Sequence, residues 1–169
     1  MSERIFITLG SQKFQFNRLL IAMDKLCEKK VISGEDVFAQ TGYSDYAPRN
    51  YSYNNFLDRE EFGVEMGKAD IVITHGGTGA IIGAVKKGKK VIAVPRRAKY
   101  GEHVDDHQLQ LVGQFKELDL ICECDDTGKI GEALETVKNT IYKSYVSNTR
   151  TIIDSIEQYI KNTAISGDK

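Results

Sequence analysis

The chain has 169 residues, of which 41% are hydrophobic and 28% charged, and its formal net charge at pH 7 is −1. This length predicts a single folded domain over residues 1–169 with a sizeable core, and the ordinary composition excludes a wholly disordered chain. The balanced charge gives no reason to expect nucleic-acid binding, so any anion site must be local.

The cysteines and the lengths of the apolar runs indicate the cellular compartment of the protein. The chain has three cysteines, two of which, Cys122 and Cys124, form a C-x-C pair. The odd count and the lack of zinc spacing predict reduced thiols in a cytosolic protein. The amino-terminal apolar run is too short for a secretion signal, and no run approaches the roughly 20 apolar residues of a membrane span. We therefore expect a soluble cytoplasmic protein, or one that another component holds at a membrane.

The amino-terminal third predicts strands and one helix. Residues 4–9 are mostly apolar and predict a buried strand, whereas residues 17–30 place apolar side chains at helical spacing, with Asn17 as the N-cap. A second strand is expected over residues 35–42. After a polar, tyrosine-rich loop, a short third strand is expected near residues 51–56.

The middle of the chain predicts a helix and then a central strand. Residues 58–69 fit a short helix that Asp58 caps, with Glu60 and Glu61 in the first turn, where the helix dipole favours acidic side chains. Residues 70–74 follow as the strand.

Another helix and strand follow this central strand. A helix is predicted from Thr78, and Gly88 ends it as the C′ residue. Residues 89–95 predict the next strand, and a charged loop leads to the carboxyl-terminal third.

The carboxyl-terminal third predicts three helices and one strand. The first helix places Leu109, Val112 and Phe115 on one face. In chain order, the expected elements are a helix over residues 106–118, a strand over 119–124, and helices over about 128–144 and 148–163.

Strands and helices alternate along the whole chain. This pattern predicts an α/β domain with a Rossmann-like parallel sheet and helices on both faces. Ligands of such sheets lie beyond the carboxyl ends of the strands, where loops lead into helices. The loops to inspect are therefore residues 8–14, 74–79 and 94–103, together with the turn before Asp106.

The glycine cluster at residues 76–79 predicts an anion site. Gly76, Gly77 and Gly79 follow a strand and precede a helix, so main-chain amides and the helix dipole favour a phosphate or diphosphate there. Thr78 offers a hydroxyl, and His75 is a candidate donor to the same ligand. The alternative interpretation is a tight turn that serves only helix–sheet packing.

The spacing of these glycines leaves the phosphate ligand open. The P-loop pattern is absent, and G-x-G-x-x-x-G over residues 77–83 is one residue longer than the dinucleotide fingerprint. Where an NAD site needs an acidic residue, the chain has Arg96 and Arg97. An NADP-dependent enzyme therefore remains an alternative, and the same arginines with Lys99 are candidates to screen a diphosphate.

A second polar cluster lies between residues 102 and 108. Its carboxylates and imidazoles permit a metal site as one alternative, but the expected loop lacks the helical spacing of metal ligands. Asp106 fits an N-cap, and Gln108 is then expected to face the edge of a cleft. Such donors and acceptors suit a hydroxyl-rich ligand such as a sugar. The side chains are Glu102, His103, Asp105, Asp106, His107 and Gln108.

Three motifs in this order resemble the carboxyl-terminal, nucleotide-sugar-binding half of family 28 glycosyltransferases. They are "TLGSQKF", "FLDREEFGVEMGKADIVITHGGTG" and "AVPRRAKYGEHVDDHQLQL". The chain is most similar to the small donor-binding subunits of split enzymes. Those include bacterial exopolysaccharide and capsule enzymes and the eukaryotic small subunit that adds N-acetylglucosamine to a dolichol-linked precursor.

The resemblance implies one lobe of a two-lobed, inverting GT-B transferase with a UDP-sugar donor and no metal or other cofactor. A membrane-associated partner chain would supply the acceptor lobe in a heterodimer and bring a lipid-linked saccharide acceptor. This chain would then be cytoplasmic and peripheral at the inner face of the membrane. A non-catalytic enhancer subunit of such a transferase is the alternative.

The resemblance also implies which residues bind the donor, but it assigns no catalytic base. One departure concerns Gly83, which stands where relatives often carry a carboxylate that holds the ribose. The residues implied for the diphosphate are Gly10, Ser11 and Gln12 in the first loop and His75, Gly76, Gly77, Thr78 and Gly79 in the second, with Phe56 and Leu57 for the uracil and Asp106, His107 and Gln108 for the sugar.

The last helix carries an isoleucine stripe. Ile152, Ile153, Ile156 and Ile160 fall on one face. This stripe either packs on the domain's own core or docks the partner subunit.

Overall fold

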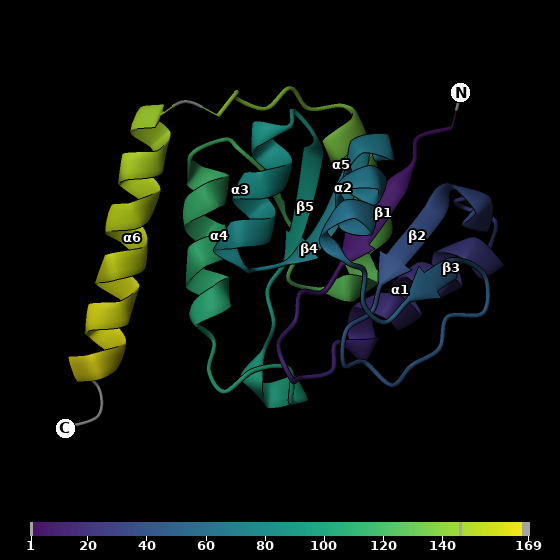
Figure 1. Cartoon of the computed structure of the whole chain (residues 1–169), viewed down its shortest axis with the longest axis horizontal. Helices are drawn as coiled ribbons and strands as arrows, with labels where there is room; N and C mark the ends of the chain where they lie inside the picture. The colour runs from purple at the N-terminus through teal and green to yellow at the C-terminus, as the bar shows by residue number, and fades with distance from the viewer. Residues whose placement is uncertain (1, 146, 167–169) are drawn as a thin grey trace.

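The computed structural model describes residues 2–145 and 147–166. Within them the chain forms a six-stranded parallel sheet in the order β3-β2-β1-β4-β5-β6 (Figure 1). The strands are β1 (Ile5–Thr8), β2 (Val37–Gln40), β3 (Ser52–Asn54), β4 (Ile71–His75), β5 (Lys90–Val94) and β6 (Cys122–Glu123). The helices are α1 (Asn17–Glu28), α2 (Arg59–Lys68), α3 (Thr78–Lys86), α4 (His107–Glu117), α5 (Ile130–Lys138) and α6 (Ser147–Ser166).

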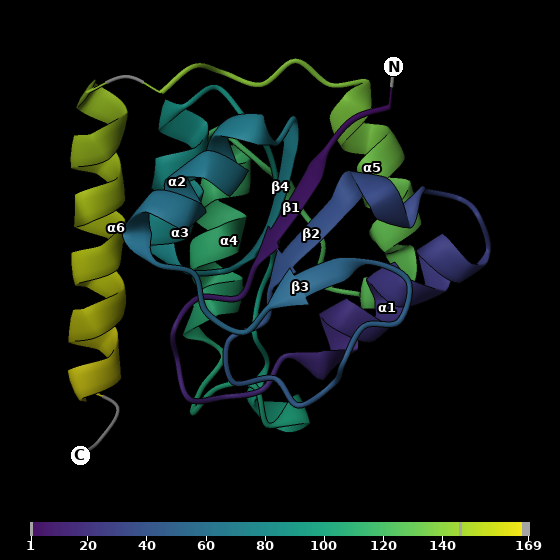
Figure 2. The ribbon, with the colours of Figure 1, turned by 45° about the vertical axis from the view of Figure 1, so that its right-hand side comes forward.

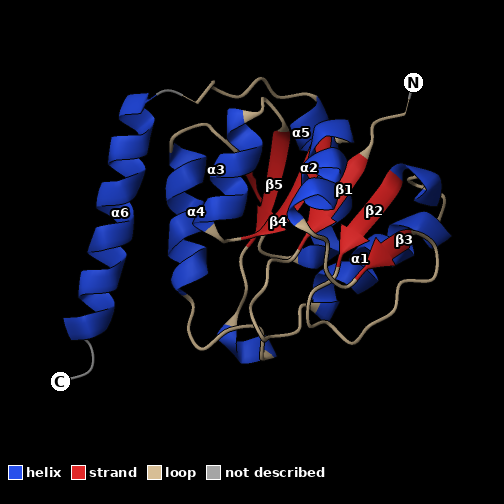
Figure 3. Cartoon of the chain, viewed as in Figure 1, coloured by secondary structure: helices blue, strands red, loops and turns tan. Residues whose placement is uncertain are grey.

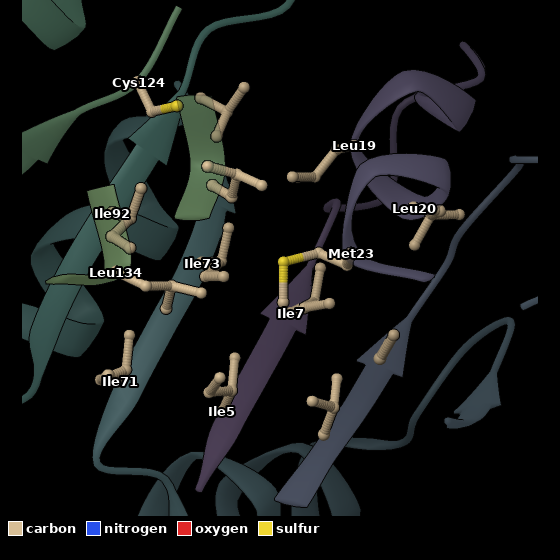
Figure 4. Close-up of a cluster of buried hydrophobic side chains, with 14 of the residues drawn as sticks. Ile5, Ile7, Leu19, Leu20, Met23, Ile71, Ile73, Ile92, Cys124 and Leu134 are labelled. Atoms are coloured by element: carbon tan, nitrogen blue, oxygen red, sulfur yellow. The ribbon is translucent and has the colours of Figure 1, made fainter. Parts of the chain in front are cut away.

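Helices cover both faces of the sheet, as the alternating pattern predicts. On one face, Ile5 and Ile7 of β1 pack with Leu19 and Met23 of α1 and with Leu134 of α5 (Figure 4). Because neighbouring strand residues point to opposite faces, Phe6 belongs to a second hydrophobic cluster on the other face of the sheet. This explains why the central strands are apolar at nearly every position.

The second cluster holds the remaining helices against the sheet. Phe6 of β1 and Val72 of β4 belong to it, together with residues of α2, α3 and α4. Each of these helices contributes at least one buried side chain: Met66, Ile81, Ile82, Ala84, Val85, Val112 and Phe115.

The strand order reverses next to β1. From β1, the chain places β2 on one side and β4 on the other, with Thr8 in register with both Gln40 and Thr74. A parallel sheet with this arrangement has its ligand crevice at the point of reversal, beyond the carboxyl ends of the two central strands. The strand arrows in Figure 3 point to this edge, where the loops after β1 and β4 meet.

Two predicted helix ends are confirmed and one is wrong. Asp58 accepts a hydrogen bond from the Glu61 amide in a complete capping box at the start of α2, and Gly88 follows α3 with φ +72°. Asn17, however, is the first residue of α1, and Phe16 occupies the cap position. The Asn17 amide group instead bonds the 45–46 segment, donating to the Asp45 carboxylate.

The carboxyl-terminal elements differ from the prediction in length. β6 spans two residues, and α5 ends at Lys138 rather than near residue 144. Asn139 and Thr140 donate side-chain hydrogen bonds to the carbonyls of Glu135 and Thr136, which satisfies acceptors in the last turn and helps to end the helix. The chain then crosses to α6, which lies beside α4 (Figures 1 and 2).

The isoleucine stripe of α6 is divided between two surroundings. Ile153 is buried in the second cluster, and Ile156 lines a crevice against Leu111 and Phe115 of α4. The domain's own core therefore takes up part of the stripe, while the side chain of Ile152 lies outside the described residues. Within the described ranges, no helix is both long and apolar enough to pass through a bilayer.

Candidate functional site

Two glycine loops approach each other on either side of His75. The first loop (residues 9–15) follows β1, and the second loop (residues 75–79) follows β4. A Cβ atom added to Gly10 would lie 2.6 Å from His75 Nε2, and one added to Gly77 would lie 2.2 Å from His75 Cε1. Both distances are shorter than real Cβ contacts, so glycine is required at both positions for the imidazole to fit. Gly10 also has φ +74°, a left-handed conformation that favours glycine.

The amino terminus of α3 is open toward this junction. Gly77 is the N-cap residue, it makes no side-chain capping hydrogen bond, and the first turn contains no acidic residue. The first amides of a helix have no intrahelical partner, and the dipole makes this end positive. An anion placed here would meet exposed N–H groups and a favourable potential.

A cleft of about 230 Å³ opens beside the second loop. Residues of the first loop, the second loop and the start of α4 line it, so the structure brings together predicted residues far apart in sequence. The predicted residues that line the cleft are Gln12, Gly76, Gly77, Thr78, His107 and Gln108.

Sequence reasoning missed the contribution of α6 to this cleft. Glu157, Ile160 and Lys161 of that helix line the same space. Ile160 was visible in the isoleucine stripe, but its position at the cleft depends on the crossover after α5. His103 and Asp105, seen in the sequence only as part of a polar cluster, line the cleft as well.

Other predicted residues lie outside the lining of the cleft. Ser11 is exposed on the first loop, and Gly79 is exposed in the first turn of α3. Phe56 is half exposed, with its ring centroid 5.2 Å from that of Tyr43. Leu57 packs against the second hydrophobic cluster, so its predicted contact with a uracil base would use main-chain atoms.

The expected capping role of Asp106 is wrong. Asp106 stands at the N-cap position of α4 but makes no capping bond, because its carboxylate accepts the Ala98 amide and pairs with Arg97. Asp105 instead accepts the amide of His107 at 3.1 Å. Asp106 thus ties the charged loop to α4, and its contact with a sugar remains a prediction.

Gln108 lines the cleft, as expected, but is largely buried there. Its side chain is 7% exposed, and its Oε1 accepts hydrogen bonds from the amides of Gly76 and Arg96, each at 3.0 Å. Gln108 therefore joins the loops that follow β4 and β5.

His75 is a neutral imidazole at physiological pH. The residue is 6% exposed, and burial followed by the charge of Arg96 lowers its pKa to about 4. The ring can therefore donate one hydrogen bond without carrying a positive charge.

Arg96 is not a surface charge. The side chain is 1% exposed, its ring-facing guanidinium lies 5.1 Å from the Phe16 ring centroid, and burial lowers its pKa to about 10. Arg96 thus stays charged at neutral pH and holds the first loop through main-chain acceptors. The guanidinium donates to the carbonyl oxygens of Leu9, Phe14, Gln15 and Glu102.

The two arginines that suggested an NADP-dependent enzyme are both engaged elsewhere. Arg96 faces inward, and Arg97 forms a two-point ion pair with Asp125, 2.7 and 2.9 Å long, in addition to its contact with Asp106. Neither arginine is free to hold a 2′-phosphate, and the expectation that they screen a diphosphate directly is not supported for Arg96.

The polar cluster does not assemble as a metal cage. Asp105 lies 3.2 Å from both His103 Nδ1 and His107 Nδ1. Across the described residues, no group of three or more His, Cys, Asp or Glu side chains has the arrangement of a metal site. That metal takes no part in the reaction remains a prediction.

Gly83 leaves open space on α3. A side chain at this position would meet no atom within 4 Å. The position expected to hold a ribose carboxylate is therefore accessible but carries no side chain.

Comparisons with known proteins find similar sequences and similar folds. The sequence model of the family described as "Glycosyltransferase family 28 C-terminal domain" matches residues 4–164. The human "UDP-N-acetylglucosamine transferase subunit ALG13" is 28% identical over 117 residues, which cover 66% of this chain and 10% of the relative. The chain thus spans about a tenth of the length of that curated relative.

Two solved structures share the fold. The NMR solution structure of ALG13 has a TM-score of 0.58 at 19% identity and covers 86% of this chain and 90% of its own. The crystal structure of the calicheamicin glycosyltransferase CalG4 has a TM-score of 0.59 at 17% identity and covers 94% of this chain and 39% of its own.

Proposed function

This chain belongs to the glycosyltransferase family 28 C-terminal domains, and from that premise we propose that it is the donor-binding catalytic subunit of a two-chain inverting glycosyltransferase. Its fold is that of the carboxyl-terminal lobe of a GT-B glycosyltransferase. The observation that carries the proposal is the uncapped amino terminus of α3, which faces the first loop across His75.

The proposed ligand is a UDP-sugar with its diphosphate between the two loops. Amides at residues 10–12 and 77–79 and the neutral imidazole of His75 would donate hydrogen bonds to the phosphate oxygens, and the α3 dipole would favour their negative charge. When an acceptor hydroxyl attacks the anomeric carbon, the bond from that carbon to the diphosphate oxygen breaks and UDP leaves. The same donors would stabilise the negative charge that develops on UDP, without a metal.

The proposed partner is a membrane-associated subunit that carries the acceptor lobe. A cleft of about 230 Å³ is smaller than the roughly 300–1,000 Å³ of most small-molecule sites, which suits a site completed by a second chain. The general base that takes the hydroxyl proton would lie on that partner. The subunit would then act in the cytoplasm at the inner face of the membrane, on a lipid-linked saccharide.

One biosynthetic setting and one donor can be proposed. The bacterial split enzymes that the motifs resemble act in exopolysaccharide and capsule synthesis, and we propose that setting here. The name of the human relative points to UDP-N-acetylglucosamine as one donor to test.

A non-catalytic enhancer subunit is the second candidate. The observation that favours it is Gly83, because the position expected to hold the ribose has no carboxylate. An enhancer would increase the activity of a partner that binds its own donor.

Calorimetric titration and reconstitution test these proposals together. We expect the chain alone to bind UDP and a subset of UDP-sugars better than NADPH, and to transfer sugar only with the partner present. Full transfer by the chain alone would contradict the split enzyme, and absent UDP binding would contradict the donor site. Gly77→Val should remove UDP binding and reconstituted transfer, since its side chain would meet His75; a folded Gly77→Val subunit that still supports full transfer would favour the enhancer.

A further inference from the structure

We propose that Gln108 is a positioning residue that joins the two sides of the donor cleft and fixes which nitrogen of His75 carries the proton. This inference rests on the proposed donor site for its functional consequence. The assignment of the proton, however, follows from contacts in the ligand-free protein.

The two backbone donors determine the orientation of the Gln108 amide. Gly76 N and Arg96 N both point at the same side-chain atom, each at 3.0 Å. Backbone N–H groups only donate, so the atom that receives both bonds must be the oxygen. The NH₂ group of Gln108 is therefore on the opposite side of the amide.

That NH₂ group faces the imidazole of His75. Gln108 Nε2 lies 3.3 Å from His75 Nδ1. An amide NH₂ cannot accept, so Nδ1 must be the unprotonated acceptor and the ring proton must be on Nε2. The charged Arg96 and the imidazole of His103, which also face this ring, oppose a second proton.

The protonated Nε2 lies between the two glycine loops. It is 2.6 Å from a Cβ position at Gly10 and 2.8 Å from one at Gly77. Within the described residues, Nε2 makes no hydrogen bond of its own. The Nε2–H group is thus an unpaired donor at the junction where the diphosphate is proposed to bind.

This role differs from a direct contact with the sugar. Both lone pairs of the Gln108 oxygen already accept backbone amides, so the oxygen has no capacity left for a sugar hydroxyl. A residue that touches only the sugar would alter affinity for UDP-sugars and leave UDP binding unchanged. A residue that holds the second loop and orients His75 would alter the binding of UDP itself.

Imidazole ¹⁵N NMR of the free protein at pH 7 tests the proton assignment. We expect His75 Nδ1 to be unprotonated and Nε2 protonated. In Gln108→Glu, a carboxylate can still accept from Gly76 and Arg96 but can only accept from His75, so Nδ1 should become protonated. Gln110→Glu, an exposed position on the same helix, is the matched charge control and should leave the His75 signals unchanged.

UDP titration of the same variants tests the functional consequence. We expect Gln108→Glu to weaken UDP binding at least about tenfold, and Gln110→Glu to leave it unchanged. Gln108→Met removes the hydrogen bonds to both loops and the hydrogen bond to His75. It serves as the second variant if the glutamate variant unfolds, and it should also weaken UDP binding.

Each result separates the positioning role from the donor site. A protonated Nδ1 in the parent protein, or unchanged His75 signals in Gln108→Glu, would overturn the inference. The inference would also be overturned if Gln108→Glu bound UDP with full affinity and bound only UDP-sugars more weakly. Because the spectra are recorded without ligand, they support or overturn the His75 assignment even if UDP fails to bind, which would contradict the proposed function instead.

Discussion

Helices α2 and α3 both begin at the carboxyl edge of the sheet and on the same face, but their first turns are built in opposite ways. The start of α2 is closed by the Asp58–Glu61 capping box, and Glu60 adds a further acidic side chain. The start of α3 has Gly77 in place of a capping side chain and no acid in its first turn.

The difference identifies which helix end is available to a ligand. At α2 the Glu61 amide donates to the Asp58 carboxylate, and the acidic side chains of this turn would repel a phosphate. At α3 the first amides are left open next to a second glycine loop and a buried imidazole donor. A capped terminus contributes stability, whereas an uncapped terminus at a sheet crevice is available for binding.

The largest expected effect is the pH dependence of folding stability that the buried His75 imidazole causes. The His75 pKa of about 4 lies below the ordinary value of about 6.5, so the unfolded state takes up a proton first as the pH falls. The stabilising contribution is complete above about pH 6.5 and decreases toward pH 4, by about 2 kcal/mol between pH 7 and pH 5.

Urea unfolding of the parent and His75→Gln at pH 7 and pH 5 measures this effect. The parent should lose about 2 kcal/mol more than the variant on acidification. Equal losses in the two proteins would show that His75 is not held neutral by its surroundings.

The second prediction concerns an acidic residue placed in the first turn of α3, as in α2. Gly79 occupies the same turn position as Glu60 does in α2, and a side chain there meets no atom within 4 Å. Gly79→Glu should weaken UDP binding about tenfold by repulsion and leave the fold at least as stable, because glycine is a poor helix former. Gly79→Gln is the neutral control. If both variants bind UDP equally, charge at this terminus does not matter.

The converse change removes the cap of α2. Asp58→Ala should lower the free energy of unfolding by about 1 kcal/mol, since the Glu61 amide loses its acceptor. UDP affinity should stay unchanged in calorimetry. A loss of UDP binding in a folded Asp58→Ala protein would indicate that both helix ends serve the ligand.

The smallest expected effect adds a side chain to the open position on α3. Gly83→Glu should raise UDP affinity about threefold through a hydrogen bond to the ribose, with Gly83→Gln and a 2′-deoxy nucleotide as controls. A gain that persists with the deoxy nucleotide would contradict this contact.

Local signals made much of the domain predictable. The apolar runs of β1 and β4, the capping box at Asp58 and the glycine that ends α3 depend on residues close in sequence, and the structure confirms them. The glycines of the second loop were found for the same reason, whereas Gly10 was assigned through the resemblance to family 28 glycosyltransferases.

Long-range contacts explain what the sequence did not reveal. Arg96 appeared as a surface charge because its carbonyl partners at Leu9 and Phe14 lie more than 80 residues away. The same holds for Gln108, whose orientation depends on two loops of the folded sheet. The approach of α6 to the cleft depends on a crossover that no periodicity encodes.

The most direct test of the donor site is a UDP titration followed by backbone amide NMR. The account predicts that the largest chemical-shift changes fall on the amides of Gly10, Ser11, Gly77, Thr78 and Gly79, with small changes at Asp58 and Glu61. No shift at the two glycine loops, or the largest shifts at the start of α2, would contradict it.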